Sequence, residues 1–423
     1  MAVFLLPGCV QLTIAWANLS PEGPRAEPEI LTEKATGSEI SSKDVWEQFA
    51  RPKIKRDLQR YIYGTMPDRH QLRILDQRII DTSAFEGLGI LSEYRLKAEV
   101  FFGDSETTTR DFYMNVVMPA GNPSAPVILI QTFCPRWDTM PHSGISRPEG
   151  ARSCSGGFAS GIMEYVFGRY IATPPLEMIL ESGYGVATIF PSEIVDDSKE
   201  QGLKDLRDLS PNHSVKNPRW GAIAAWAWGF SLMVDALEAS DNVSSTEFIS
   251  LGHSRYGKSA LVAAAFDERI SAVVAHQSGT GGASLNRKKK GESVTSITES
   301  YPHWFADTYK NPGGKDEIWP VDQHQLLAII APRPILLGNA RRDVWSDPNG
   351  AFRAAMGADP VYELYGLAGL DQSRLDAWHP SAELAFWIRP GTHGVVREDW
   401  PAFIAFLDQH FIQESGGVNG EGR

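Results

Sequence analysis

The sequence predicts an α/β fold with a doubly wound, mostly parallel sheet. Short apolar runs begin near residues 126, 183, 247, 271 and 333, for example "PVILIQTF" and "RPILLGNA". Such continuous apolarity is typical of parallel strands that are covered on both faces. Stretches with helical patterning, such as "SALVAAAF", lie between these runs. The alternation of strands with helices indicates a doubly wound sheet.

Further elements precede and follow this series. Residues 45–64 have the pattern of a helix that ends near Gly64, and residues 91–102 and 109–120 predict an antiparallel strand pair that opens the sheet. Residues 220–239 are apolar almost throughout, which predicts a buried helix. The stretch "WPAFIAFLDQHF" predicts a closing helix near the end of the chain.

Size and charge limit the organisation and the partners. The chain has 423 residues, of which 42% are hydrophobic, so it can bury a large core. Since no repeat or second-domain boundary is evident, we expect a single domain over residues 42–415 and a flexible tail over residues 416–423. The net charge of -12 argues against nucleic-acid binding, and no apolar run has transmembrane length and clean flanks. We therefore expect no nucleic acid and no membrane as partner, and a monomer.

The N-terminal residues differ from the rest of the chain. Residues 1–17 are apolar and end in Ala15-Trp16-Ala17, the small-x-small pattern of a signal cleavage site. No basic residue precedes the apolar stretch, and Pro7 with Gly8 interrupts it. The interpretations that stay open are an export signal, which would make the protein secreted or periplasmic, a frayed apolar end, or a misassigned start codon. Residues 18–41, rich in Pro, Glu, Ser and Lys, are typical of a solvated linker.

The cysteine pattern excludes a disulfide framework. Only Cys9, Cys134 and Cys154 occur, so one disulfide or a set of unpaired thiols are both compatible with the sequence. None has a partner at metal-site spacing, so we expect no metal and no cofactor.

The stretch "FISLGHSRYGKSALVAAAF" contains the main chemical signal. It predicts a strand, a sharp turn that carries Ser254, and a helix, which is how an α/β-hydrolase fold presents its nucleophile. The match to the G-x-S-x-G pattern is imperfect, because Tyr256 stands where a glycine is usual and Gly257 follows it. The alternative is a serine that only caps the helix.

A serine nucleophile needs a base, which this fold places last in the chain order. His393, in the glycine-flanked loop "RPGTHGVVREDWPAF", lies just before the closing helix and is our candidate. His410 lies within that helix and is a weaker alternative, and His379 is more typical of a helix boundary.

The acid should follow a strand between the serine and the histidine. Asp343 comes soon after the strand "PILLGNA" and is the candidate, whereas Asp347, which precedes Pro348, is typical of a turn or helix N-cap. The preceding strand offers Gln277 and Ser278 at the equivalent place, and neither is an acid.

Two cations stand beside the serine. The N–H of Arg255 would lie at the helix N-terminus, where the helix dipole favours negative charge, and its guanidinium would add a full charge where an oxyanion forms. Lys258 follows Ser254 by one helical turn, so it can point into the same cleft. Both could instead be solvent-facing charges.

With these residues in view, "GHSRYGKSA" resembles the signature of the glucuronoyl esterases, carbohydrate esterase family fifteen. The segments "YPHWF", "VDQHQLLAIIAPRP", "DVWSDPNGAF" and "GTHG" resemble bacterial members in the same order. The resemblance implies an α/β-hydrolase fold and a serine esterase acting on glucuronate esters, with the ester between 4-O-methyl-glucuronate of glucuronoxylan and lignin alcohols as the natural substrate.

The resemblance also implies a role for each matching residue. Ser254 would be the nucleophile, His393 the base, Asp343 the acid at the bacterial position, and Arg255 the oxyanion stabiliser. Contacts to the uronate ring would come from Lys258, Glu292 and Trp345.

The chain departs from the fungal pattern in two places. Gln277 stands where fungal members carry their glutamate, and His253 and Gly394 replace two cysteines. Two other functions therefore stay open: an acetyl-type carbohydrate esterase, and a non-catalytic carbohydrate-binding relative whose triad has decayed.

Overall fold

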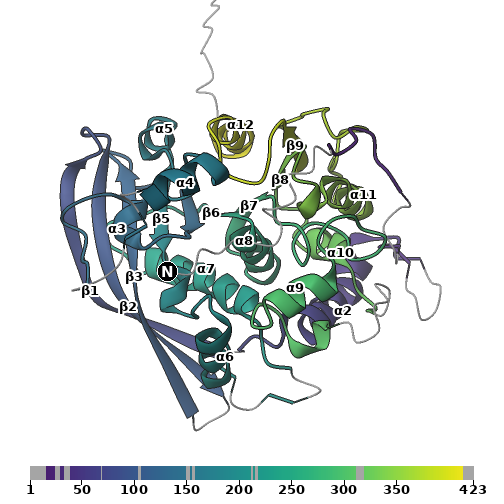
Figure 1. Cartoon of the computed structure of the whole chain (residues 1–423), viewed down its shortest axis with the longest axis horizontal. Coiled ribbons are helices and arrows are strands. Elements are labelled where there is room, and N and C mark those ends of the chain that lie inside the picture. The colour runs from purple at the N-terminus through teal and green to yellow at the C-terminus, as the bar shows by residue number, and fades with distance from the viewer. Residues whose placement is uncertain are drawn as a thin grey trace, which may run out of the picture.

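The computed structural model describes residues 16–23, 29–32, 39–67, 69–102, 106–148, 153–154, 158–210, 213–214, 218–310 and 319–412. Within these ranges nine strands form one sheet in the order β1-β2-β3-β5-β4-β6-β7-β8-β9, and Figure 1 shows the long strands β1–β3 at one side of it. The strands are β1 (Arg69–Ala84), β2 (Gly89–Phe102), β3 (Glu106–Pro119), β4 (Val127–Gln131), β5 (Gly185–Ile189), β6 (Phe248–His253), β7 (Ile270–His276), β8 (Ile335–Ala340) and β9 (Leu384–Arg389).

The strand directions agree with the predicted architecture. Strands β1, β2, β3 and β5 pair antiparallel in succession, whereas β5, β4 and β6 to β9 pair parallel. The doubly wound sheet and the antiparallel pair β2–β3 are thus confirmed. Strands β1 and β9 were not predicted. Most of β1 is exposed or only partly buried, because it forms a charged sheet edge of the kind that discourages pairing with other chains.

Helices precede and separate the strands. The predicted helix over residues 45–64 is confirmed as a continuous helical segment that stops at Gly64, where φ is 85°. The helical elements are α1 (Lys43–Val45), η2 (Trp46–Ala50), α2 (Arg51–Leu58), η3 (Gln59–Tyr63), α3 (Arg136–Thr139), α4 (Phe158–Phe167), α5 (Leu176–Glu181), η4 (Pro191–Glu193), α6 (Lys199–Asp208), α7 (Ala222–Glu238), α8 (Arg255–Phe266), α9 (Val294–Ser300), η5 (Asp307–Tyr309), α10 (Gln323–Ala328), η6 (Val344–Ser346), α11 (Pro348–Leu364) and α12 (Asp399–Phe411).

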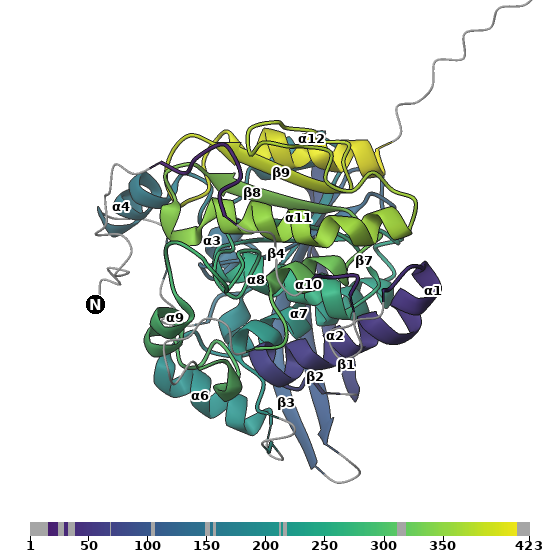
Figure 2. The same cartoon turned by 90° about the vertical axis from the view of Figure 1, so that its right-hand side faces the viewer.

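The helices cover the sheet on both faces. Alternate strand residues point to opposite sides, so Val127 and Leu129 pack with α2, α7, α8, α10 and α11, while Ile128 and Ile130 pack with α5 and α12. Figure 2 shows α12 above β8 and β9 and α11 below them. The predicted buried helix is α7, which has fourteen buried residues. This two-sided cover explains why the parallel strands are apolar throughout.

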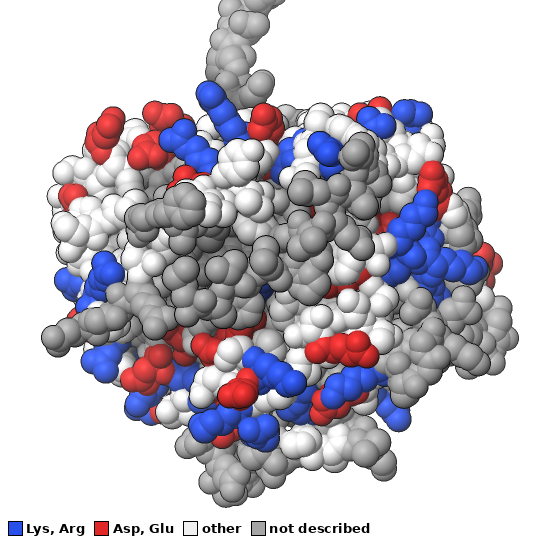
Figure 3. All heavy atoms as spheres, in the orientation of Figure 1, with Lys and Arg blue, Asp and Glu red and all other residues white. Residues whose placement is uncertain are grey.

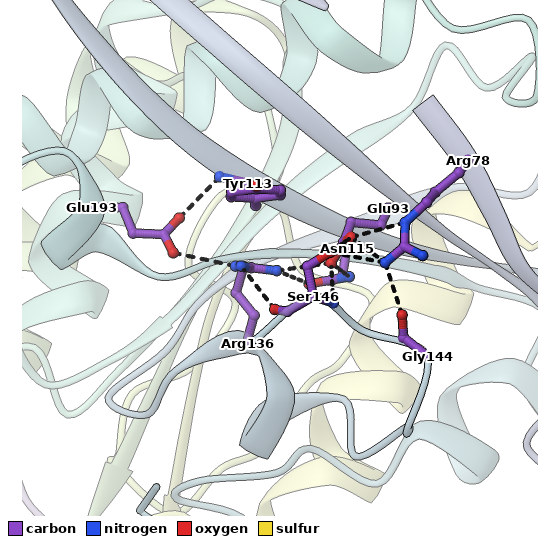
Figure 4. Close-up of polar contacts among 8 residues, drawn as sticks. All are labelled: Arg78, Glu93, Tyr113, Asn115, Arg136, Gly144, Ser146 and Glu193. Atoms are coloured by element: carbon purple, nitrogen blue, oxygen red, sulfur yellow. Dashed lines mark hydrogen bonds and ion pairs between the residues drawn. The ribbon is translucent and has the colours of Figure 1, made fainter. Parts of the chain in front are cut away.

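A buried ionic cluster fastens the loop after β4 to the antiparallel strands. Figure 4 shows Arg136 and Arg78 on either side of Glu93. Arg136, 1% exposed, donates from Nη1 to Glu93 Oε2 at 3.0 Å and from Nε to Glu193 Oε1 at 3.3 Å. Ser146 adds a backbone N–H to Glu93 Oε2 at 2.9 Å. The cluster therefore joins α3 and the following loop to β2.

The cysteine alternatives are decided by the structure. Cys134 and Cys154 form a disulfide with a Cα–Cα distance of 5.6 Å. Cys9 lies outside the described residues, as do residues 1–15 of the predicted signal and the predicted tail at 416–423.

The surface is mixed in charge on the face shown in Figure 3, where lysine and arginine side chains alternate with acidic ones around the periphery. In the described part of the chain, every helix is too short or too polar to cross a bilayer.

Candidate active site

A cavity of about 1020 Å³ contains all seven residues that the sequence nominated. Its lining includes Ser254, Arg255, Lys258, Glu292, Asp343, Trp345 and His393. Ser254 follows β6, Asp343 follows β8, and His393 follows β9, so the triad candidates come from the carboxyl ends of parallel strands. This is the edge at which open α/β sheets bind their ligands.

Ser254 occupies a strained turn. Its φ of 56° and ψ of -120° are rare for a residue with a side chain, and its N–H donates to the His276 carbonyl at 2.8 Å. A Cβ added to Gly252 would lie 2.0 Å from the Tyr256 carbonyl oxygen, so only glycine fits there. This tight approach is typical of a nucleophile elbow.

The packing around this turn also explains why Tyr256 stands where the G-x-S-x-G pattern has a glycine. Tyr256 is 2% exposed and packs against Phe133 and Trp226, with ring centroids 4.8 and 5.3 Å away. The second close approach falls on Gly257, where an added Cβ would lie 2.9 Å from the Gly252 carbonyl oxygen. The glycine is therefore needed one residue later than in the usual pattern.

His393 and Asp343 are hydrogen-bonded. His393 Nδ1 lies 2.7 Å from Asp343 Oδ2. Burial raises the pKa of Asp343, but the charge of His393 and the hydrogen bonds from His393 and Ser346 outweigh it and hold that pKa below its ordinary value. An ionised Asp343 favours the tautomer with a proton on Nδ1, which leaves Nε2 to accept one.

Ser254 and His393 line the same cavity, and within the described residues the Ser254 hydroxyl has no hydrogen-bond partner. Catalytic hydrogen bonds are often long before substrate binds, so the geometry is compatible with a serine–histidine pair.

Asp347 has the structural role that the sequence predicted. It caps α11, and its side chain accepts the N–H groups of Gly350 and Lys290, both at 3.0 Å.

Gln277 holds the loop that carries His393. Its Oε1 accepts the Gly394 N–H at 2.8 Å, and its side chain is almost fully buried. Gly394 has a φ of 151°, and a Cβ there would lie 2.2 Å from the Phe167 carbonyl oxygen. This explains why no cysteine can occupy position 394 in this backbone.

His253 stands at the second position where fungal members have a cysteine. Its buried ring lies between the rings of His276 and His393. Its ring centroid lies 4.6 Å from that of His393, and its Nδ1 lies 3.1 Å from His276 Nδ1. Burial, reinforced by neighbouring cationic groups, holds the pKa of His253 well below its ordinary value.

Arg255 is held in an aromatic pocket. Its guanidinium pairs with Asp197 and lies 4.9 Å from the ring centroid of Trp304 and 5.4 Å from that of Phe133. Trp304 is buried at 4% exposure and also lines the cavity. Asp197 was not among the residues predicted from the sequence. Its position beyond the carboxyl end of β5 is the one signal that could have suggested it.

Lys258 and Glu292 line the cavity beside Ser254, and the charge of each influences the other. Lys258 is 4% exposed and donates from Nζ to the Ser278 carbonyl, and burial lowers its pKa to about 8. Burial raises the pKa of Glu292, and the Lys258 charge opposes that shift. The Glu292 N–H donates to the Trp345 carbonyl at 2.9 Å, which joins these candidates.

Trp16, Ala17, Asn18 and Glu22 also line the cavity, which the sequence did not predict. The Ala17 N–H donates to the Arg341 carbonyl at 2.6 Å, and the Glu22 N–H donates to Asn349 Oδ1 at 2.7 Å. This segment is therefore attached to the turn that carries Asp343. Within the described ranges, no three His, Cys, Asp or Glu side chains are grouped so as to hold a metal ion.

Comparison with known proteins agrees with this geometry. A family model described as "Glucuronyl esterase, fungi" matches residues 171–366. The chain is 31% identical over 394 residues to carbohydrate esterase MZ0003 from an unknown prokaryotic organism, covering 88% of this chain and 87% of that protein. It is 34% identical over 155 residues to 4-O-methyl-glucuronoyl methylesterase 1 of Wolfiporia cocos, covering 34% of this chain and 38% of that protein.

The structural comparison extends over nearly the whole chain. A solved structure described as a promiscuous CE15 esterase from the marine bacterial metagenome superposes with a TM-score of 0.77 at 30% identity, covering 93% of this chain and 100% of that chain. The predicted α/β-hydrolase fold is thereby confirmed. The chain belongs to carbohydrate esterase family 15, the glucuronoyl esterases, as a bacterial-type member.

Proposed function

We propose that this protein is a serine esterase that hydrolyses esters of the glucuronate carboxyl group. The observation that carries the proposal is one cavity lined by an elbow serine, a hydrogen-bonded histidine–aspartate pair, a buried lysine and a glutamate. The serine, histidine and aspartate serve ester cleavage in general, whereas Lys258 and Glu292 suit the hydroxyls of a sugar ring.

The first half of the reaction forms an acyl-enzyme. Ser254 Oγ attacks the ester carbonyl carbon while its proton passes to His393 Nε2. The tetrahedral oxyanion is stabilised by the Arg255 N–H and guanidinium. The bond to the alcohol oxygen then breaks, and His393 gives the proton to the leaving alcohol.

The second half releases glucuronate. Water attacks the acyl carbon, its proton passes to His393, and the bond to Ser254 Oγ breaks as that oxygen regains the proton. Asp343 stabilises the imidazolium in both halves, because its ionised carboxylate lies 2.7 Å from Nδ1.

Three residues are proposed to hold the sugar. Lys258 donates to ring hydroxyls, Glu292 accepts from them, and Trp345 offers an apolar face. All three border the cavity that contains Ser254.

The natural substrate is proposed to be the ester between 4-O-methyl-glucuronate of glucuronoxylan and lignin alcohols. The protein would act as a monomer, secreted or in the periplasm. The Cys134–Cys154 disulfide supports an oxidising compartment.

The test compares benzyl glucuronate with acetylated xylan as substrates. The proposal expects a higher kcat/KM for benzyl glucuronate. A preference for acetyl groups would favour the acetyl-esterase alternative. If neither ester were cleaved while glucuronate still bound, the non-catalytic alternative would stand. The Asp343–His393 hydrogen bond argues against a non-catalytic relative with a decayed triad.

A further inference from the structure

Asp197 contacts three donors around the proposed oxyanion site. It lies between η4 and α6 and is 15% exposed. Its Oδ1 accepts from Trp304 Nε1 at 2.8 Å and lies 3.1 Å from His303 Nε2, and its Oδ2 accepts from Arg255 Nη1. The carboxylate is therefore held on one oxygen and holds Arg255 with the other.

The guanidinium of Arg255 is confined in its other directions by aromatic rings. Trp304 and Tyr301 stack with centroids 3.8 Å apart and planes 6° from parallel. The guanidinium carbon lies 4.9 Å from the Trp304 centroid and 5.9 Å from that of Tyr301. The long, flexible Arg255 side chain is thereby held near one orientation. Its conformational entropy is lost when the protein folds and not during the reaction.

Donors remain free on Arg255 after this pairing. Within the described residues, Nη1 bonds to Asp197, whereas Nε and Nη2 have no hydrogen-bond partner. Arg255 lines the cavity together with Ser254. Asp197 thus engages Nη1, the Nε donor is buried, and Nη2 is left for an anion.

We infer that Asp197 is a positioning residue that orients the Arg255 guanidinium toward the oxyanion, with His303 and Trp304 fixing the carboxylate. The inference rests on the proposed function, since it names what prepares the oxyanion site of that same reaction. Donors that are oriented before the reaction need no reorganisation as charge develops, so their loss falls on the chemical step.

The charge state of Asp197 agrees with this role. Burial raises the pKa of Asp197, but Arg255, His303 and Trp304 outweigh burial, so the pKa lies below its ordinary value and the group is ionised at neutral pH.

The test is a double-mutant cycle in the full chain. Asp197→Asn should lower kcat by about 10- to 100-fold and change KM by less than about twofold, whereas Arg255→Gln alone should cost on the order of 100- to 1000-fold. In the Arg255→Gln background, Asp197→Asn should lower kcat by less than about twofold. An equal loss in both backgrounds would overturn the inference.

A neighbouring carboxylate supplies the matched control. Asp196 precedes Asp197, and its backbone N–H donates to Asp205 Oδ2 at 3.0 Å. Asp196→Asn should leave kcat unchanged. Asp197→Glu keeps the charge but moves the carboxylate, so it should fold as the wild type does and still lose kcat. An unchanged kcat in Asp197→Glu would contradict positioning.

The inference and the proposed function can fail separately. If the wild type cleaves p-nitrophenyl acetate but no glucuronate ester, the proposed function fails. The same cycle measured with p-nitrophenyl acetate then still decides whether Asp197 acts through Arg255.

Discussion

Asp343 and His393 lie 50 residues apart in the chain, and the Asp343 carboxylate accepts the His393 Nδ1–H at 2.7 Å. Asp343, the proposed acid, lies in the turn after β8. The position after β7, where the fungal pattern has a glutamate, is filled by Gln277, which accepts a backbone N–H from the histidine loop.

Replacing Asp343 with Asn should lower kcat by on the order of 10³- to 10⁴-fold, because the amide favours the wrong histidine tautomer. Steady-state kinetics with benzyl glucuronate would measure the loss. The control is Asp347→Asn, which keeps an N-cap acceptor for α11 and should change the free energy of unfolding and kcat only slightly. If Asp347→Asn caused the larger loss of kcat, the assignment of the acid would be wrong.

Replacing Ser254 with Ala should abolish turnover and leave glucuronate binding intact, since the elbow is set by the backbone around Gly252. Calorimetric titration with glucuronate and an ester assay would separate the two effects. Retained turnover in this variant would refute the acyl-enzyme mechanism.

Lys258 should impose a pH dependence on KM. Burial lowers the Lys258 pKa to about 8, so its positive charge is present below that pH and is lost as the pH rises through it. KM for benzyl glucuronate should therefore rise above pH 8, because the proposed donor to the sugar loses a proton. The variant Lys258→Arg should show no such rise up to about pH 10, since arginine stays charged. A wild-type KM that stays flat over this range would exclude the proposed contact.

His253 should make the free energy of unfolding fall in acid. Burial depresses its pKa in the folded state, so below about pH 6.5 the unfolded chain binds a proton that the folded chain resists. Stability is thus full above about pH 6.5 and decreases as the pH falls, by up to about 1.4 kcal/mol per pH unit. Urea unfolding measured between pH 5 and 7 should show that the free energy of unfolding of His253→Asn changes less with pH than that of the wild type. His379 lies in an exposed loop, so the control His379→Asn should keep the wild-type dependence of unfolding free energy on pH.

The buried cluster around Arg136 should be a weak point for substitution. Glu93→Gln leaves Arg136 buried without its closest carboxylate, and the loss of one partner from a buried pair typically costs about 3–5 kcal/mol. Asp111, which pairs with Arg95 at 3.8 Å on the surface, serves as control, and Asp111→Asn should cost under about 1 kcal/mol. Thermal and urea unfolding would compare the stability losses of Glu93→Gln and Asp111→Asn. Equal costs would mean that the cluster is no more stabilising than a surface pair.

The elements that the sequence predicted are those with a local signature. Buried parallel strands are apolar throughout, so β4 to β8 were evident from composition alone. Strand β9 was missed, although all but two of its residues are buried. Its neighbour in the sheet is β8, 49 positions earlier at the first paired residues, Ile335 and Leu384. Strand β1 was missed because its exposed edge carries many charges.

The sequence by itself determined the strand–turn–helix at Ser254 and the chain order of serine, acid and histidine, because both depend on near neighbours and on a fixed topology. Tertiary structure alone decided that Asp197 holds Arg255 and that Cys134 pairs with Cys154. These contacts join residues 58 and 20 positions apart. Which side chains meet across such separations depends on strand register and loop paths, and no local pattern of residues encodes either.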